Sequence, residues 1–255
     1  MKSKKLYNYI NMLKELTISD FKLRYNGSFI GIFWFVIKPL SMLTVLYIIF
    51  GLVLKTGIQN YVPFLFLGII FWNFFVESTT MSMDNILDKK MIIRAIYLPR
   101  QLLVLSSTLN AFMSLAINLV LLFAMLALFK IHLGFTAFAA FLLLAMLLVF
   151  SLGVSYLLAA LYVKYRDISH VWQVILQLGF WITPVIYSTT MIPKIYLDAY
   201  MLNPLAWIIA SARDALIYDS LSMKGFLAIA AICIAIYIVG YYTYCAKSKY
   251  FAEEL

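Results

Sequence analysis

The chain has 255 residues, of which 65% are hydrophobic and 12% charged, whereas a soluble domain is about half apolar and about a quarter charged. This composition excludes an ordinary soluble domain and indicates a protein whose main solvent is lipid. The net charge of +9 does not indicate nucleic-acid binding, because the basic residues stand at the ends of apolar segments, where they set topology and contact anionic lipid.

Residues 1–28 are predicted to form an amphipathic helix that lies in the cytosolic interface of the membrane. Within residues 4–22, Leu6, Ile10, Leu13 and Leu16 recur at helical spacing, with Lys and Glu residues around them. The segment is too polar to cross a bilayer. A soluble amphipathic helix is the alternative, but a membrane span begins only a few residues later, which favours the interface.

Six segments of the remaining chain meet, or nearly meet, the length of about 20 apolar residues that a membrane-spanning helix needs. They are residues 29–54, 62–83, 102–129, 135–163, 171–187 and 226–246. The fifth is the weakest, because it is short and carries Gln173 and Gln177. The sequence therefore predicts an all-α integral membrane protein with six transmembrane helices in a single domain, residues 29–255.

The distribution of Lys and Arg predicts the orientation. With the amino terminus inside, 14 of these residues fall in cytosolic segments and five in external ones. Positive residues favour the cytosolic side, so both termini are predicted to be cytosolic.

Residues 188–224 are predicted to form short half-helices at the external face. Asn203 and Pro204 are typical of a helix N-cap followed by a first-turn proline, and Pro193 can open another short helix. A re-entrant or surface-lying hairpin fits this pattern. Non-spanning backbone at membrane depth must be buried in protein or line water, so the hairpin is a candidate gate.

Charged and aromatic residues inside the spans are candidates for function. Lys38 and Glu77 lie at similar predicted depths, and we expect them to form an ion pair; separate snorkelling to the headgroups is the alternative. Phe71, Trp72 and Phe75 lie near the middle of the second span, where they can bind apolar faces of sugars or pack between helices.

Sequence motifs for catalysis and nucleotide binding are absent. The chain has no G-x-x-x-x-G-K-[ST] phosphate loop, no H-E-x-x-H and no G-x-S-x-G, and its Cys and His residues do not cluster. We expect no catalytic, metal or cofactor site in this chain.

Four motifs resemble those of the ABC-2-type permeases, and in particular the polysaccharide exporters. The first resembles D-x-K-x-R-Y-x-x-S-x-L-G-x-x-W with a later proline, and is matched by Asp20, Lys22, Arg24, Tyr25, Ser28, Gly31, Trp34 and Pro39, with Ile30 in place of leucine. Residues 92–107 are similar to their L-I-K-K-x-x-F-P-R-E-x-L-P loop, with Gln101 and Val104 as departures. Tyr165-Arg166-Asp167 and Asn203-Pro204 followed by Arg213-Asp214 are similar to two further family patterns.

The resemblance implies a homodimer in the bacterial cytoplasmic membrane, joined to two ATP-binding cassette subunits that bind ATP and Mg. Its implied substrate is a lipid-linked glycan, most typically O-antigen, with capsule or teichoic acid as alternatives. A permease for a smaller lipid or drug is the second reading. A membrane enzyme or secondary carrier would require more mid-span acids than Glu77.

Site roles follow from this resemblance. Residues 84–101 would couple to the ATPase, through Ile92, Ile93, Arg94, Tyr97, Leu98, Pro99 and Arg100; a basic loop that only fixes topology is the alternative. Lys22, Arg24 and Tyr25 would meet the glycan pyrophosphate as it enters, although bulk attraction to headgroups explains the same charges. The channel between two copies would be lined by Trp34, Phe71, Trp72, Phe75, Gln173, Gln177 and Trp181. For Gln173 and Gln177, hydrogen bonding to neighbouring helices is the alternative. The external gate would contain Tyr187, Asn203, Pro204 and Arg213.

Overall fold

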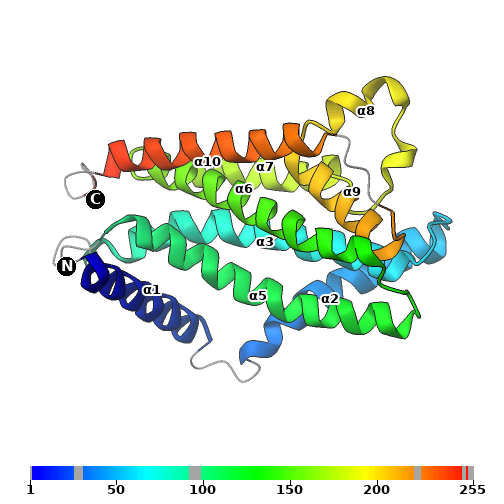
Figure 1. The fold of residues 1–255 in the computed structure, drawn as a ribbon, viewed down its shortest axis with the longest axis horizontal. Helices are drawn as coiled ribbons and strands as arrows, with labels where there is room; N and C mark the ends of the chain where they lie inside the picture. The colour runs from blue at the N-terminus through cyan, green and yellow to red at the C-terminus, as the bar shows by residue number, and fades with distance from the viewer. Residues whose placement is uncertain (1, 26–30, 92–98, 221–224, 249–250, 252–255) are drawn as a thin grey trace.

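The computed structural model describes residues 2–25, 31–91, 99–220, 225–248 and 251. Within these ranges the chain forms helices and turns, and no strand. Most of the long helices run side by side in one bundle (Figure 1). The all-α class that the composition predicts is therefore confirmed for the described part of the chain.

Five helical stretches of the described chain are long and apolar enough to cross a membrane. The first is α2 (Trp34–Leu46) with its π-helical continuation η2 (Tyr47–Val53), and two others are α3 (Tyr61–Asp88) and α5 (Gln101–Leu128). The remaining two are the short helix η3 (Phe135–Phe138) with α6 (Ala139–Tyr162), and α10 (Phe226–Ser248). They coincide with five of the six predicted spans.

The fifth span, which was predicted over residues 171–187, is a shorter helix in the structure. It forms α7 (Ile168–Ile182), whose 15 residues correspond to about 22 Å, against about 30 Å for a hydrocarbon core. The helix ends there because Thr183 precedes Pro184, and the residue before a proline is driven from helical into extended backbone; Thr183 has ψ 142°.

Helix α3 forms the centre of the bundle. Its first half is apolar on every side, and Leu65, Phe66, Leu67 and Ile69 are completely buried. A helix without a polar face has to be surrounded, and α2, α5, α6, α7 and α9 all contact α3. Beside it, α6 packs closely on α10 where Gly240 meets the backbone of Gly153.

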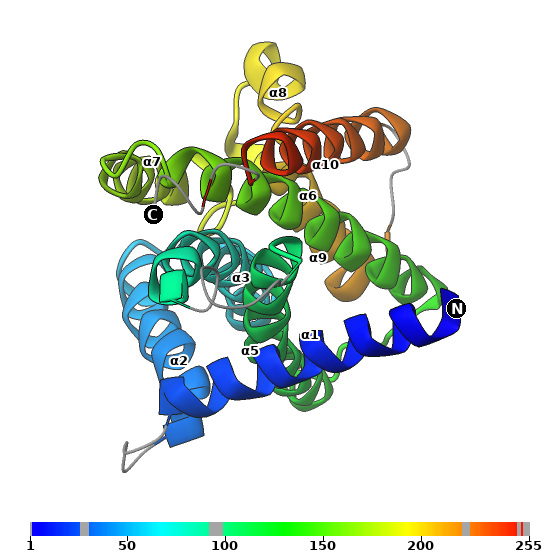
Figure 2. The same cartoon turned by 90° about the vertical axis from the view of Figure 1, so that its left-hand side faces the viewer.

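Helix α1 (Lys2–Tyr25) lies across the end of the bundle where α10 also finishes (Figures 1 and 2). It is steeply inclined to the long helices and contacts α5. The helix predicted over residues 4–22 is therefore present. Ile10 is 53% exposed, whereas Leu13 and Leu16 are half-buried, so the apolar stripe is only partly covered by the protein.

The region after α7 contains two short helices where they were predicted. They are α8 (Lys194–Tyr200) and α9 (Pro204–Ile217), preceded by a single 3-10 turn, η4 (Thr189–Met191). Asn203 caps α9 by accepting a hydrogen bond from the Leu205 amide at 3.1 Å, and Pro204 occupies the first turn. Only Asp214 in α9 is not fully buried, so α9 is an interior helix and does not lie on the surface.

Candidate functional site

The predicted coupling segment, residues 84–101, is described only at its two ends. Ile92, Ile93, Arg94, Tyr97 and Leu98 lie outside the described residues. Residues 84–88 continue α3 by more than a turn beyond the predicted span, and Pro99 and Arg100 stand half-buried before α5. The structure shows how both ends of the segment are held.

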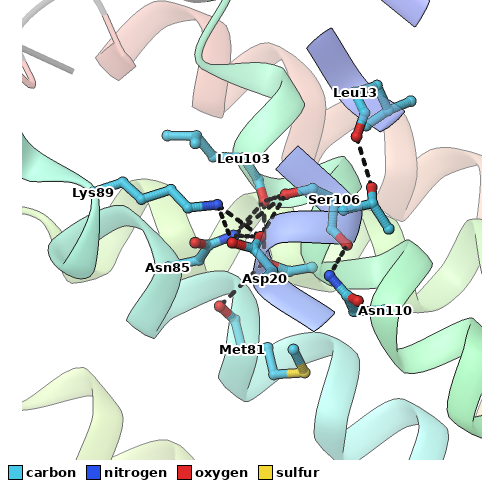
Figure 3. Close-up of polar contacts among 10 residues, drawn as sticks. Leu13, Asp20, Met81, Asn85, Lys89, Leu103, Ser106 and Asn110 are labelled. Atoms are coloured by element: carbon cyan, nitrogen blue, oxygen red, sulfur yellow. Dashed lines mark hydrogen bonds and ion pairs between the residues drawn. The ribbon is translucent and has the colours of Figure 1, made fainter. Parts of the chain in front are cut away.

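The α3 end is tied to α1 by an ion pair. Lys89 Nζ lies 2.6 Å from each carboxylate oxygen of Asp20, and the two side chains are only 10% and 12% exposed. Figure 3 shows the two side chains meeting between α1 and the end of α3. Charges this buried are stable in place only when they are paired and hydrogen-bonded.

Asn85 joins the same cluster to α5. Its amide nitrogen lies 2.8 Å from Ser107 Oγ, 3.1 Å from the Leu103 carbonyl and 3.2 Å from Asp20 Oδ2 (Figure 3). Ser106 Oγ also donates to Asp20 Oδ2, at 3.3 Å. An NH₂ group has two hydrogens, so Asn85 donates to these acceptors alternately or through bifurcated hydrogen bonds. We call Asp20, Asn85, Lys89 and Ser106 the Asp20 cluster; it joins three helices.

The α5 end of the coupling segment is held by α10 and α6. Tyr244, which is completely buried, donates its hydroxyl to the Arg100 carbonyl at 2.8 Å. Gln101 donates its side-chain amide to Cys245 Sγ at 3.1 Å, and Tyr156 reaches the Gln101 carbonyl at 3.5 Å. A force applied between residues 91 and 99 would therefore reach α1 through Lys89 and α10 through Arg100.

Lys22, Arg24 and Tyr25 follow the Asp20 cluster within α1. Lys22 is exposed, and the side chains of Arg24 and Tyr25 lie outside those the structure describes. Asp20 fixes this last part of α1 against α3 and α5. The predicted pyrophosphate contacts therefore lie beside the cluster that also holds the α3 end of the predicted coupling segment.

The intramembrane charges Lys38 and Glu77 line one cavity. It measures about 660 Å³ and lies between α2, α3 and α5. Asn73, Ser114 and Asn118 contribute further polar groups to its wall. The structure brings the two charges to one place, and their direct pairing stays a prediction.

The seven predicted channel residues divide into two sets. Phe71, Trp72 and Phe75 are at most 6% exposed in this chain, and Phe75 stacks on Phe150 with ring centroids 5.4 Å apart. Burial of these three rings is what the alternative of packing between helices predicts. Trp34 is 40% and Trp181 55% exposed, and Gln173 and Gln177 are exposed on α7. These four are the members of the set that can meet another molecule directly.

Among the predicted gate residues, Arg213 is an interior clamp. It is 2% exposed and donates Nε to the Phe64 carbonyl at 3.0 Å and Nη2 to the Val185 carbonyl at 2.7 Å. Nη1 donates to the Pro184 carbonyl, and the guanidinium lies 3.5 Å from the centroid of the Phe64 ring. Arg213 thus fixes the turn after α7 against α3 and does not face an external opening.

Tyr187 and Tyr200 close the same turn from its outer side. Their hydroxyls lie 3.0 Å apart, and each is within hydrogen-bond distance of the Ile182 carbonyl, the last carbonyl of α7. Since each hydroxyl has one hydrogen, one donates to this carbonyl while the other donates to its neighbouring hydroxyl. Burial, together with the hydrogen bond to Tyr187, raises the pKa of Tyr200 far above its usual value. The hydroxyl therefore stays protonated and keeps donating.

Sequence reasoning did not single out Asn85, Ser106 and Tyr244, which hold the two ends of the predicted coupling segment. Asn85 and Ser106 are polar residues at the adjoining ends of two apolar helices, which is a usable signal. Tyr244 carries no such signal, because one tyrosine among 18 does not stand out. Among the described residues no group of three or more His, Cys, Asp or Glu side chains could hold a metal ion.

Comparison with known proteins adds a family and several relatives. The family model for the ABC-2 type transporter matches residues 12–217. An O-antigen export system permease protein RfbA of Klebsiella pneumoniae is 30% identical over 251 residues, covering 96% of this chain and 95% of that protein. The protein of the same name from Myxococcus xanthus is 28% identical over 260 residues, covering 99% and 98%.

Proposed function

Because the chain belongs to the ABC-2 type transporter family, we propose that it is the membrane permease subunit of an exporter for a lipid-linked O-antigen chain. The observation that carries the proposal is similarity over almost the full length of relatives named as O-antigen export permeases. The four sequence motifs support the same assignment. A permease for capsule, teichoic acid or a smaller lipid remains the alternative.

The proposed topology has six crossings, both termini in the cytosol and the bacterial cytoplasmic membrane as its location. The end of α10 and the helix α1 lie at the same end of the bundle, which supports an even number of crossings (Figure 1). Helix α7 would complete its crossing through residues 183–186. These residues are all buried, which meets the requirement that non-helical backbone at membrane depth be enclosed by protein.

Energy would come from two separate ATP-binding subunits, which bind ATP and Mg, acting on a dimer of this chain. The coupling segment would dock on them, and the Asp20 cluster and Tyr244 would pass the resulting movement to α1 and α10. Replacing Ile93 and Leu98 with charged residues should abolish stimulation of the partner ATPase while membrane insertion continues. Unchanged transport by that variant would contradict the coupling assignment.

The proposed path lies between the two copies. The exposed groups of α2 and α7, namely Trp34, Gln173, Gln177 and Trp181, would line it, with Phe71, Trp72 and Phe75 supporting them from behind. Lys22, Arg24 and Tyr25 would receive the pyrophosphate at the cytosolic side. Tyr187, Asn203 and Pro204 would shape the external mouth.

The test is the surface glycan of cells that lack this chain. We expect loss of O-antigen from the cell surface and accumulation of lipid-linked glycan inside, with both restored by the intact gene. If surface O-antigen persists while export of capsule, teichoic acid or a smaller lipid fails, the molecule whose export fails is the substrate. Persistence of all four would overturn the exporter assignment.

A further inference from the structure

Helix α3 has one open side in its second half, and that side is polar. Between Asn73 and Asp88, six polar and three apolar residues are not buried, and they recur at spacings of three and four, as the residues on one side of a helix do. The polar ones are Asn73, Glu77, Thr80, Asp84, Asn85 and Asp88. We call this side the polar face of α3. Hydrocarbon packed against it would be a costly neighbour for these groups.

Helices α5, α6 and α10 show the opposite pattern. From position 105 to 128 of α5, every residue that is not buried is apolar, and the six polar residues are all buried. The residues of α6 that are not buried are apolar as well, and the exposed residues of α10 between positions 227 and 239 are Leu, Ile, Val and Ala only. The outward sides of these three helices therefore suit lipid, whereas the polar face of α3 does not.

The neighbours of the polar face also carry exposed polar residues. Helix α3 contacts both α2 and α7, and Figure 2, which looks along the bundle, shows these two helices on either side of α3. The exposed polar residues are Lys38, Ser41 and Thr44 on α2 and Gln173 and Gln177 on α7. The long helices thus gather exposed polar groups on the side of the bundle where α2, α3 and α7 meet.

Asn73 lies at the deep end of the polar face. Its side chain is half-buried, lines the cavity of about 660 Å³ together with Lys38, and makes no hydrogen bond to another described residue. Along α3 it stands about 22 Å from Asp88, which is deep within a membrane-spanning helix. An amide that is open to a cavity at this depth needs water or a hydroxyl-bearing molecule to supply its hydrogen bonds.

Building on the proposed function, we propose that the polar face of α3 is the floor of a water-filled groove, with α2 and α7 as its walls, and that the sugar chain of the exported glycan runs along this floor. Asp84 and Asp88 are exposed at the end of α3 that leads into the coupling segment, so the floor begins where the glycan enters. Sugar hydroxyls donate and accept hydrogen bonds as water does. The chain can therefore replace water step by step without leaving carboxylates or amides unsatisfied.

The experiment measures how fast single cysteines react with a water-soluble methanethiosulfonate reagent, in permease assembled with its ATPase partner in nanodiscs. The two native cysteines are first replaced, giving C233A/C245A. Asn73→Cys and Thr80→Cys then place a thiol on the floor at two depths. The reactive species is the thiolate, which forms in water and not in lipid, so both thiols should react at least about tenfold faster than thiols that face lipid.

Ile234→Cys and Val239→Cys, on α10, are the matched controls. The two residues are 52% and 57% exposed, and they lie about as far from the end of α10 as Asn73 and Thr80 lie from the end of α3. Reaction rates of N73C and T80C that do not exceed those of I234C and V239C would overturn the groove. Lipid on the polar face and a dry contact with a second copy both give that result. The two floor positions keep the test decisive if one variant does not assemble.

Lipid-linked O-antigen tests the route of the sugar chain. At a glycan concentration of about three times its Kd, the reaction at T80C should slow about fourfold, with no change at V239C. The lipid carrier without its glycan should give no protection. An unchanged rate at T80C, or equal protection by the carrier alone, would overturn the route along α3. The proposed function is tested separately by surface O-antigen in cells with the wild-type chain, so export without protection of T80C removes the route alone.

Discussion

Lys89, at the end of α3, and Asp20, in α1, form an ion pair in which Lys89 Nζ lies 2.6 Å from both carboxylate oxygens. The two residues are 69 positions apart, and together they hold the terminal helix α1 against the helix that leads into the coupling segment. Asn85 and Ser106 add hydrogen bonds to the same carboxylate. A change in the position of Lys89 must therefore move α1 or break a buried pair.

Replacing Lys89 with Met should destabilise the protein, because it leaves the Asp20 carboxylate buried without a cation. We expect a loss of about 3 kcal/mol in the free energy of unfolding, seen as a lower midpoint of thermal unfolding in detergent. The double variant D20N/K89M should recover most of the loss. Lys90→Met, at the neighbouring exposed position, should have little effect; an equal loss there would refute the role of the pair.

Replacing Arg213 with Lys should loosen the turn after α7 even though the charge is kept. One ammonium group cannot replace a planar guanidinium that reaches the carbonyls of Phe64, Pro184 and Val185 together. We expect a loss of about 2–3 kcal/mol in stability. Limited proteolysis should cut between α7 and α9 faster than in the wild type. Unchanged cleavage would show that Arg213 is not the clamp.

Replacing Gly240 with Ala should push α6 and α10 apart. A Cβ atom at this position would lie 2.1 Å from the Gly153 carbonyl oxygen, which is backbone and cannot swing away. We expect destabilisation of about 1–3 kcal/mol, measured by thermal unfolding. At Gly179 the added Cβ would meet only the edge of Trp72 at 3.0 Å, so G179A should cost less. The reverse order would contradict the packing described here.

Replacing Tyr244 with Phe removes the hydroxyl that holds the Arg100 carbonyl at 2.8 Å. The carbonyl still accepts from the Leu103 amide at 3.1 Å, so loss of the hydroxyl should cost about 0.5–1.5 kcal/mol. Stimulation of the partner ATPase should also fall, because the α5 end of the coupling segment is no longer held to α10. Tyr242→Phe is the control, since Tyr242 lies on the same helix and is 68% exposed. Normal stimulation in Y244F would limit Tyr244 to a structural role.

Much of the fold follows from local sequence. Apolar runs predict five helices of spanning length, the Asn203–Pro204 pair predicts the start of α9, and the motif around Asp20 indicates the family. The early end of α7 also follows from the sequence, because Pro184 disfavours helical backbone at Thr183. The prediction placed the end later because the residues after Pro184 are apolar. The site was less predictable: Lys38 and Glu77 were singled out together, whereas Asn118, Asn85 and Tyr244 were not.

The sequence by itself determined which segments are helices and which of them prefer lipid, because both properties depend on about 20 neighbouring residues at a time. Only the tertiary structure decided that Asp20 meets Lys89, that Arg213 faces inward and that Asn118 lines a cavity. Those contacts depend on the rotation and depth of each helix in the bundle. The packing of all the helices sets these quantities jointly, and no single segment of sequence contains them.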